Sequence, residues 1–160
     1  MTAQQIIDAL GLEPLPVEGG MVLQTYKSSL TIDGQSAGTT IYYLLSDSDF
    51  SHLHCLTGDE IYHFYLGDPV EMLELLPDGT TKITILGPDI LNGQCVQHLV
   101  PAGNWQGSHL LPGGQFALLG TTMCPGYSDD GYTHGNAKDL TGRYPEAEKL
   151  IYQLTGCREE

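Results

Sequence analysis

Hydrophobic positions change their spacing along the chain, and this change marks a switch in secondary structure. Near the N-terminus, Ile6, Ile7 and Leu10 lie at helical spacing within residues 2–11. Gly11 stands where a left-handed C-terminal cap belongs. Beyond residue 20, short runs rich in β-branched, aromatic and aliphatic residues alternate with turn-forming residues. The pattern therefore predicts a short N-terminal helix followed by many strands.

Nine runs qualify as strands, and Gly, Pro and Asp residues separate them. They span residues 21–27, 39–45, 50–56, 60–66, 70–76, 82–86, 94–100, 105–110 and 116–123. Many short strands at regular spacing are typical of an all-β sandwich or barrel. A last apolar stripe, with Pro145 at a first-turn position, predicts a C-terminal helix over about residues 144–154.

Length and charge narrow the class of protein. A chain of 160 residues with 41% hydrophobic residues suits one domain, residues 1–160, with the barrel over about residues 20–127. The 20 acidic residues outnumber the six Lys and Arg residues, which gives a formal net charge of -14. This balance argues against nucleic acid and against an anionic membrane surface as partners. No apolar run approaches the ~20 residues of a membrane-spanning helix.

The N-terminal residues contain no basic region followed by an apolar core, so we expect no signal peptide. The four cysteines are widely spaced, without a Cys-x-x-Cys motif. Without a secretion signal, free thiols are more common than disulfides. We therefore expect a cytoplasmic protein.

Candidate chemistry is concentrated between residues 51 and 67. On a strand, His52 and His54 share one face, ~6.6 Å apart along the backbone. A Gly-Asp turn follows, and Glu60 begins the next strand. Two imidazoles and one carboxylate on one face suit a divalent transition metal, Fe, Mn, Ni or Zn, and leave coordination positions open. The alternative is a polar pocket of hydrogen-bonded side chains without an ion.

The order of these residues resembles a known family. His-x-His, then Glu, then Gly, over residues 52–67, is similar to the first motif of the cupin superfamily. Gly, then Pro-x-Gly, over residues 93–106, is similar to its second motif. Three segments, Leu53-His54, 59–64 and 100–106, further resemble a small single-domain, sugar-epimerase-like branch that is catalogued as a domain of unknown function.

The resemblance covers roughly residues 3–135 and implies a jelly-roll, or double-stranded β-helix, barrel. It also implies a homodimer formed through N-terminal strands. One departure concerns the metal ligands, because Gln106 replaces the histidine of the second motif. An amide oxygen is a poorer ligand than imidazole for these ions. The implied set is His52, His54 and Glu60, with Gln106 as a weak fourth ligand or a hydrogen-bonding partner of a bound water.

Further residues are candidates for the wall of a substrate pocket. Tyr42, Tyr62 and Phe64 either line a cavity or fill the core. Ser108 shares a strand face with Gln106, and His98 is either a site residue or a hydrogen-bonded barrel residue.

These observations support two functions of different classes. The first is a metal-dependent enzyme, an isomerase, dioxygenase or decarboxylase acting on a small polar metabolite, with His54 and Glu60 as catalytic residues. The second is a metal-free cupin that binds a sugar, nucleotide or similar metabolite, either without catalysis or as an acid–base epimerase. A structural or storage cupin with a filled barrel is a third reading.

Overall fold

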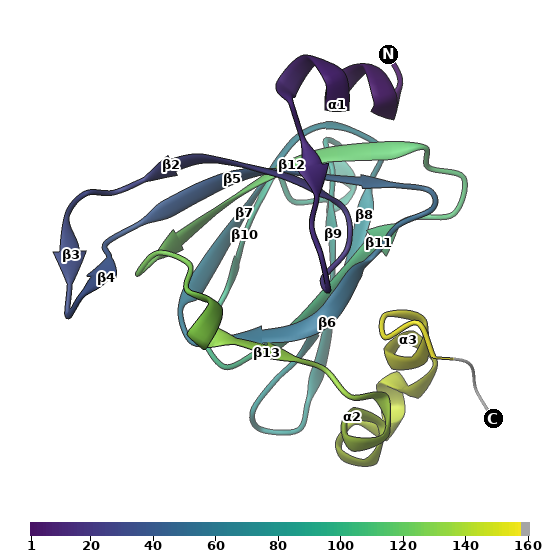
Figure 1. The fold of residues 1–160 in the computed structure, drawn as a ribbon. Coiled ribbons are helices and arrows are strands. Elements are labelled where there is room, and N and C mark those ends of the chain that lie inside the picture. Colours follow the sequence, from purple (N-terminus) through teal and green to yellow (C-terminus); the bar gives the residue numbers. More distant parts are fainter. Residues whose placement is uncertain (158–160) are drawn as a thin grey trace.

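A computed structural model describes residues 1–157, which form two facing antiparallel sheets and helices at both ends (Figure 1). The six-stranded sheet contains, in spatial order, β1 (Glu13–Pro14), β2 (Met21–Lys27), β5 (Thr39–Ser46), β12 (Phe116–Cys124), β7 (Asp59–Gly67) and β10 (Gln97–Val100). The five-stranded sheet contains β13 (Tyr132–His134), β6 (Ser51–Leu56), β11 (Trp105–Leu110), β8 (Val70–Leu75) and β9 (Thr81–Leu86). A separate hairpin pairs β3 (Thr31–Ile32) with β4 (Gln35–Ser36).

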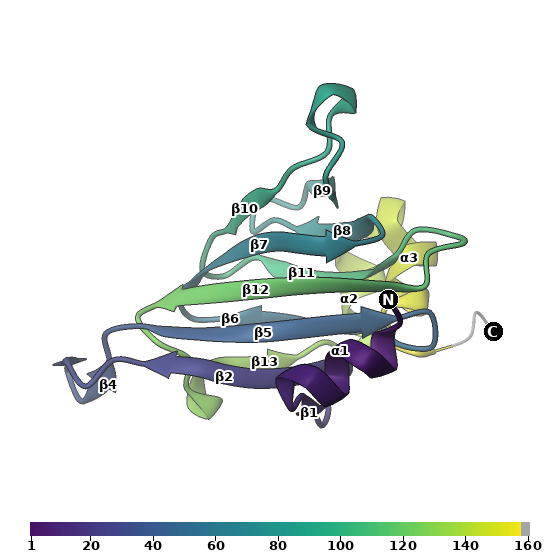
Figure 2. The same cartoon turned by 90° about the horizontal axis from the view of Figure 1, so that it is seen from above.

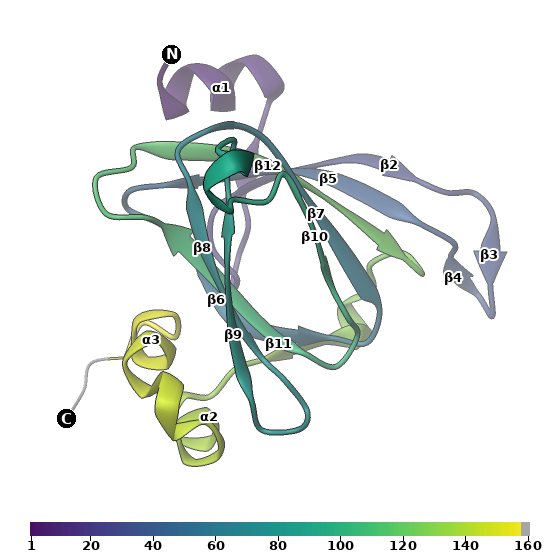
Figure 3. The ribbon, with the colours of Figure 1, turned by 180° about the vertical axis from the view of Figure 1, so that it is seen from behind.

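From β5 to β8, each strand lies in the opposite sheet from the strand before it. Seen from above, the strands of the larger sheet lie side by side (Figure 2). One side of the sandwich is closed where Cys95 meets the end of β9, through Cys95 N to Ile85 O at 2.8 Å and Gly87 N to Cys95 O at 3.0 Å (Figure 3). The all-β jelly-roll barrel expected from the sequence is confirmed.

Three apolar layers hold these elements together. Between the sheets, Tyr43, Tyr62, Met72, Val100 and Leu119 belong to the central core. The helix α1 (Ala3–Leu10) packs on the outer face of the six-stranded sheet, and C-terminal helices pack on the outer face of the other sheet. Both sheets therefore bury apolar side chains on both faces over part of their area.

Capping fixes the N-terminal helix as the sequence predicts. The Thr2 side chain accepts a hydrogen bond from the backbone N–H of Gln5, and the Gln5 side-chain oxygen accepts one from the backbone N–H of Thr2. Gly11 ends the helix in the left-handed conformation, with φ 67°. These contacts satisfy backbone groups that a helix end leaves unpaired.

The sequence predicts a single helix over residues 144–154, but the C-terminal region consists of three short segments. It forms α2 (Ala137–Arg143), a 3-10 turn (Pro145–Ala147) and α3 (Glu148–Gln153). Pro145 cannot donate to a continuing helix, so the chain turns between the two segments. The remaining short 3-10 turns cover Ile90–Asn92 and Asp129–Gly131.

The structure also bears on the expectations about the cysteines and about membrane-spanning helices. All four cysteines are free thiols. No helix in the described part of the chain is long and apolar enough to cross a membrane. The segment of β2, β3 and β4 projects from the barrel (Figure 1). Its side chains Tyr26, Leu30 and Ile32 are exposed. The homodimer stays a prediction.

Gly67, at the end of β7, provides a test of how closely β7 approaches β12. Its φ is 104°, and an added Cβ would clash with the Phe116 carbonyl oxygen and lie 3.0 Å from Ala117 Cα. Gly79, in the turn between β8 and β9, has φ 91° but an open position for a Cβ. We expect Gly79→Ala to cost about 1–2 kcal/mol in free energy of unfolding, from backbone conformation alone.

Gly67→Ala should cost about 1–3 kcal/mol more than Gly79→Ala, because the clash adds to the same backbone penalty. Urea unfolding of both variants measures the difference. Equal losses would contradict the close approach of the two strands.

Candidate functional site

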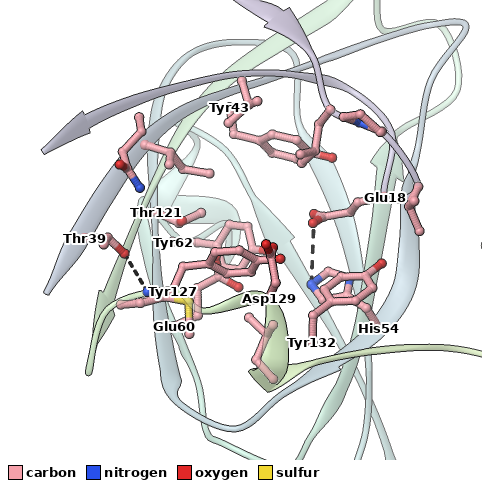
Figure 4. Close-up of a pocket in the computed structure, with 18 residues that line it drawn as sticks. Glu18, Thr39, Tyr43, His54, Glu60, Tyr62, Thr121, Tyr127, Asp129 and Tyr132 are labelled. Carbon is pink, nitrogen blue, oxygen red and sulfur yellow. Dashed lines mark hydrogen bonds and ion pairs between the residues drawn. The ribbon is translucent and has the colours of Figure 1, made fainter. Parts of the chain in front are cut away.

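A cavity of about 530 Å³ lies between the two sheets, on the side of β1 and β2 in one sheet and β13 in the other (Figure 4). Strands of both sheets and the loop before β2 contribute its walls. The lining residues are Leu15, Pro16, Val17, Glu18, Val22, Gln24, Thr39, Ile41, Tyr43, His54, Leu56, Glu60, Tyr62, Thr121, Met123, Tyr127, Asp129 and Tyr132. The volume is typical of small-molecule sites.

His54 reaches this cavity from β6 and is almost fully buried. Its Nδ1 lies 2.7 Å from the His52 carbonyl oxygen. Because a carbonyl oxygen only accepts, Nδ1 carries the proton, and in the neutral ring Nε2 keeps its lone pair. The ring stacks on Tyr132 with centroids 5.2 Å apart, and Nε2 lies 4.0 Å from Glu18 Oε1 (Figure 4).

Glu60 enters the cavity from β7, in the opposite sheet. Burial raises the pKa of its carboxyl group, and the nearby Glu18 raises it further. His54 and hydrogen bonds from Thr121 and Gln106 oppose this shift, and Gln106 Nε2 donates to Glu60 Oε2 at 2.9 Å. The net raised pKa means that Glu60 holds its proton to a higher pH than an exposed glutamate.

Four tyrosines form much of the cavity wall. Burial, reinforced by nearby carboxylates, raises the pKa of Tyr43 and Tyr62 well above the usual value. The pKa of Tyr127 is raised to about 12, by burial first and then by Asp129. Burial likewise raises the pKa of Tyr132. All four side chains are therefore neutral phenols near neutral pH.

The loop before β2 is attached firmly to the barrel beside His54. Glu18 Oε1 accepts a hydrogen bond from Ser51 Oγ at 3.0 Å, and the Glu18 carbonyl accepts from His52 N at 2.8 Å. Tyr43 Oη donates to the Gly19 carbonyl at 2.8 Å. Val17 has φ 71°, a strained conformation for a β-branched residue. These bonds hold Val17 in that conformation at the rim.

The structure brings His54, Glu60 and Tyr62 together at the cavity, but not His52. The His52 ring stacks on His134, with centroids 3.6 Å apart, and its Nδ1 donates to the Leu53 carbonyl at 2.9 Å. Between His54 and Ser51, the β6–β11 pairing places two residues of β6 opposite the single Gly107. Such a bulge breaks the strict alternation on which a shared face of His52 and His54 depends.

The remaining predicted site residues lie outside the cavity lining. Gln106 is buried and donates to Glu60, while Phe64 fills the central core. Tyr42 packs on the outer face under α1, so its neighbour Tyr43 lines the cavity instead.

Two further candidates, the partly buried His98 and the buried Ser108, lie away from the cavity. His98 is hydrogen-bonded to Glu74, whose other oxygen accepts from Asn104 Nδ2 at 3.0 Å. Ser108 Oγ is buried and has no hydrogen-bond partner among the described residues.

Comparisons with known proteins agree with this architecture. Residues 4–134 match the family model described as "Cupin superfamily (DUF985)". The chain belongs to the cupin superfamily. Protein YML079W of Saccharomyces cerevisiae is 30% identical to this cupin over 128 residues, which are 78% of this chain and 60% of the relative's length.

Solved structures include two of very similar shape. Protein SO0799 of Shewanella oneidensis has a TM-score of 0.91 at 31% identity, covering 100% of this cupin and 99% of that chain. A hypothetical protein from Leishmania major has a TM-score of 0.91 at 27% identity, covering 99% and 100%. Oxalate decarboxylase from Bacillus subtilis, with a TM-score of 0.57 at 13% identity, covers 92% of this cupin and 38% of that chain, and shares the fold alone.

The predicted metal ligands do not converge in this cupin. His52 turns to His134, and Gln106 presents its NH₂ group, not its oxygen, to Glu60. Within residues 1–157, no three His, Cys, Asp or Glu side chains are grouped so that they could hold an ion. The side chains present therefore do not fit the four-ligand set.

Sequence reasoning missed several residues of the cavity, among them Tyr43 on β5 and four residues outside the main barrel strands. Glu18 lies in the loop before β2, and Tyr127, Asp129 and Tyr132 follow β12. Two signals pointed to these segments: the Gly-Gly that ends the first loop and the Pro-Gly-Tyr at residues 125–127. Both sequence features indicate a loop, but neither indicates that side chains of that loop line a cavity.

The raised pKa of Glu60 predicts a pH-dependent effect of Glu60→Gln on stability. Below the unfolded-state pKa, the carboxyl is protonated in both states. As pH rises through the folded-state pKa, the native protein loses about 1.4 kcal/mol for each unit by which folding raises that pKa. Gln cannot ionise, so the Tm of E60Q minus that of the wild type should increase from about pH 4.5 upward.

Thermal unfolding between pH 4 and 8 measures this difference. Glu13→Gln, on the exposed strand β1, removes one carboxyl in the same way and provides the baseline. A Tm difference for E60Q that does not change with pH would show that Glu60 is not desolvated.

Proposed function

We propose that this cupin binds a small organic molecule between its sheets and that His54 and Glu60 transfer protons on it. The observation that carries the proposal is their placement on opposite walls of one cavity, in different sheets. General acid–base catalysis needs two such groups within reach of the same ligand. The reaction class is proton transfer, such as an epimerisation or isomerisation.

The two side chains are suited to different roles. His54 Nε2 has an available lone pair, because Nδ1 donates to the His52 carbonyl. His54 therefore accepts a proton from the bound molecule. Glu60, whose pKa is raised, gives its proton to the other side of that molecule. Reversal of both transfers, or exchange with solvent, restores the starting state. Gln106, which donates to Glu60, orients the carboxyl group.

Glu18 supports the role of His54. When Nε2 accepts a proton, the imidazolium lies 4.0 Å from Glu18 Oε1. An adjacent carboxylate stabilises the charged ring through space, as in other acid–base sites. Ser51 keeps Glu18 in place through its 3.0 Å hydrogen bond.

Hydrogen–deuterium exchange tests proton transfer directly. Small molecules that shift NMR signals of cavity residues are first selected from a library of neutral, anionic and cationic carbon acids. In D₂O, at least one of them should gain deuterium at carbon, as read by mass spectrometry. His54→Gln and Glu60→Gln should each slow this gain about 100-fold or more, while binding persists.

Thr122→Ser serves as a matched control, because Thr122 lies on β12 but does not line the cavity. If no bound compound exchanges, the acid–base role is wrong and the cupin is a non-catalytic binding protein. Equal exchange by wild type and both variants would also contradict the roles of His54 and Glu60.

The metal-dependent alternative makes an opposite prediction. It needs His52 to turn away from His134 toward His54 and Glu60, and Gln106 to present its oxygen in place of its NH₂ group. Our proposal predicts far less than one equivalent of Fe, Mn, Ni or Zn in protein purified without a metal-chelating tag. Elemental analysis decides: one equivalent that is lost in both His54→Ala and Glu60→Ala would favour the metal-dependent enzyme.

A further inference from the structure

Acidic side chains outnumber basic ones around the cavity. Glu18, Glu60 and Asp129 line it together with His54, and no Lys or Arg does so in the part of the chain that the structure describes. Net acidity of the whole sequence would not establish this, because charges far from a site act weakly on it. The lining itself therefore disfavours phosphates, nucleotides and carboxylates as ligands.

Neither of the two carboxylates nearest the rim has a cationic partner within residues 1–157 other than a protonated His54. Glu18, whose side chain is only 17% exposed, lies 4.0 Å from His54 Nε2. Asp129 is exposed at the rim and lies close enough to Tyr127 to raise the pKa of its phenol. Glu18 is partly buried, so it gains from a cation brought in by a ligand, and the exposed Asp129 adds negative charge at the rim.

The walls offer a second attraction for the same kind of ligand. Tyr43, Tyr62, Tyr127 and Tyr132 surround the cavity, and Figure 4 shows Asp129 beside the Tyr127 ring. The faces of neutral aromatic rings attract cations, and more strongly where water is excluded. Leu15, Ile41 and other aliphatic side chains leave most of the remaining surface apolar.

A groove that adjoins the cavity continues the same charge pattern. It shares Gln24, Tyr127 and Asp129 with the cavity, and adds Asp33 and Asp130. Lys27 is its one basic lining residue among the described positions. The approach to the cavity is thus also mainly negative, which favours entry of cations over anions.

We propose that the ligand of this cavity is an organic cation, an amine or quaternary ammonium compound with an apolar body. Its charged group lies between Glu18, Asp129 and the tyrosine faces, and its apolar body lies against the aliphatic wall. This inference deepens the proposed function and rests on the same cavity. It leaves His54 and Glu60 free to act on the part of the molecule between the sheets.

Three compounds of one shape test the charge preference: phenethylamine, 2-phenylethanol and phenylacetate, which are cationic, neutral and anionic at pH 7. Titrations followed by NMR signals of cavity residues, at 50 mM and 500 mM NaCl, give the affinities. We expect phenethylamine to bind at least about tenfold more tightly than 2-phenylethanol, and phenylacetate to bind most weakly. The preference should decrease at high salt.

Variants distinguish the effect of a charge at the cavity on ligand affinity from the effect of the protein's net charge. Glu18→Gln keeps an acceptor for Ser51, so the loop stays attached, and it should reduce the preference for phenethylamine several-fold without changing 2-phenylethanol binding. Glu13→Gln removes the same charge on the exposed β1 and should change neither affinity. Tyr132→Phe should keep the preference, whereas Tyr132→Leu should weaken it.

The outcomes distinguish this inference from the proposed function. Binding of phenylacetate or 2-phenylethanol as tight as that of phenethylamine overturns it, as does no cavity binding by any of the three at 10 mM. The proposed function survives either result if some other compound shows exchange that depends on His54 and Glu60. Conversely, a clear preference for phenethylamine stands even if no compound exchanges.

Discussion

A connection of two residues determines the geometry of the site. Thr57 and Gly58 join β6 to β7, and these consecutive strands lie in different sheets. Gly58 crosses close to the chain after β12, where an added Cβ would lie 3.2 Å from Met123 Cε and 3.4 Å from the Pro125 carbonyl. Because the crossing is so short, His54 and Glu60 end on facing walls, although they are only six positions apart in sequence.

Three apolar clusters hold those walls in place. The central core fills the barrel beyond the cavity, and the helices cover the outer faces of both sheets. Interior positions near the cavity differ, because Glu60, Gln106 and Thr121 are buried polar residues. Buried polar groups need hydrogen-bond partners, so a site of this kind has defined side-chain orientations.

Much of the fold follows from the sequence because local patterns decide it. Strand β11 has the bounds that alternation predicts, and Gly11 ends α1 as a left-handed cap. Tyr42 shows where alternation is ambiguous: α1 covers the outer face of β5, so both faces of that strand are apolar. Nothing in the local pattern states which tyrosine, Tyr42 or Tyr43, faces inward.

The site was harder to predict, for reasons that are not local. The bulge in β6 exists only in its pairing with β11, and it separates His52 from His54. Strand β13 is three residues long, too short for a periodic signal, yet it supplies Tyr132 and the stacking partner of His52. Glu18 is one acidic residue in a Pro- and Gly-rich loop until the fold places it beside His54.

The cavity is lined by strands and by loops, which differ in how readily they tolerate changes of sequence. His54, Glu60, Tyr43 and Tyr62 lie on long strands inside the barrel, whereas Glu18 and Asp129 lie in loops at its mouth. Loops accept substitutions and changes of length far more readily than paired strands do. Loop changes at the mouth can therefore alter ligand preference while the strands that hold His54 and Glu60 stay the same.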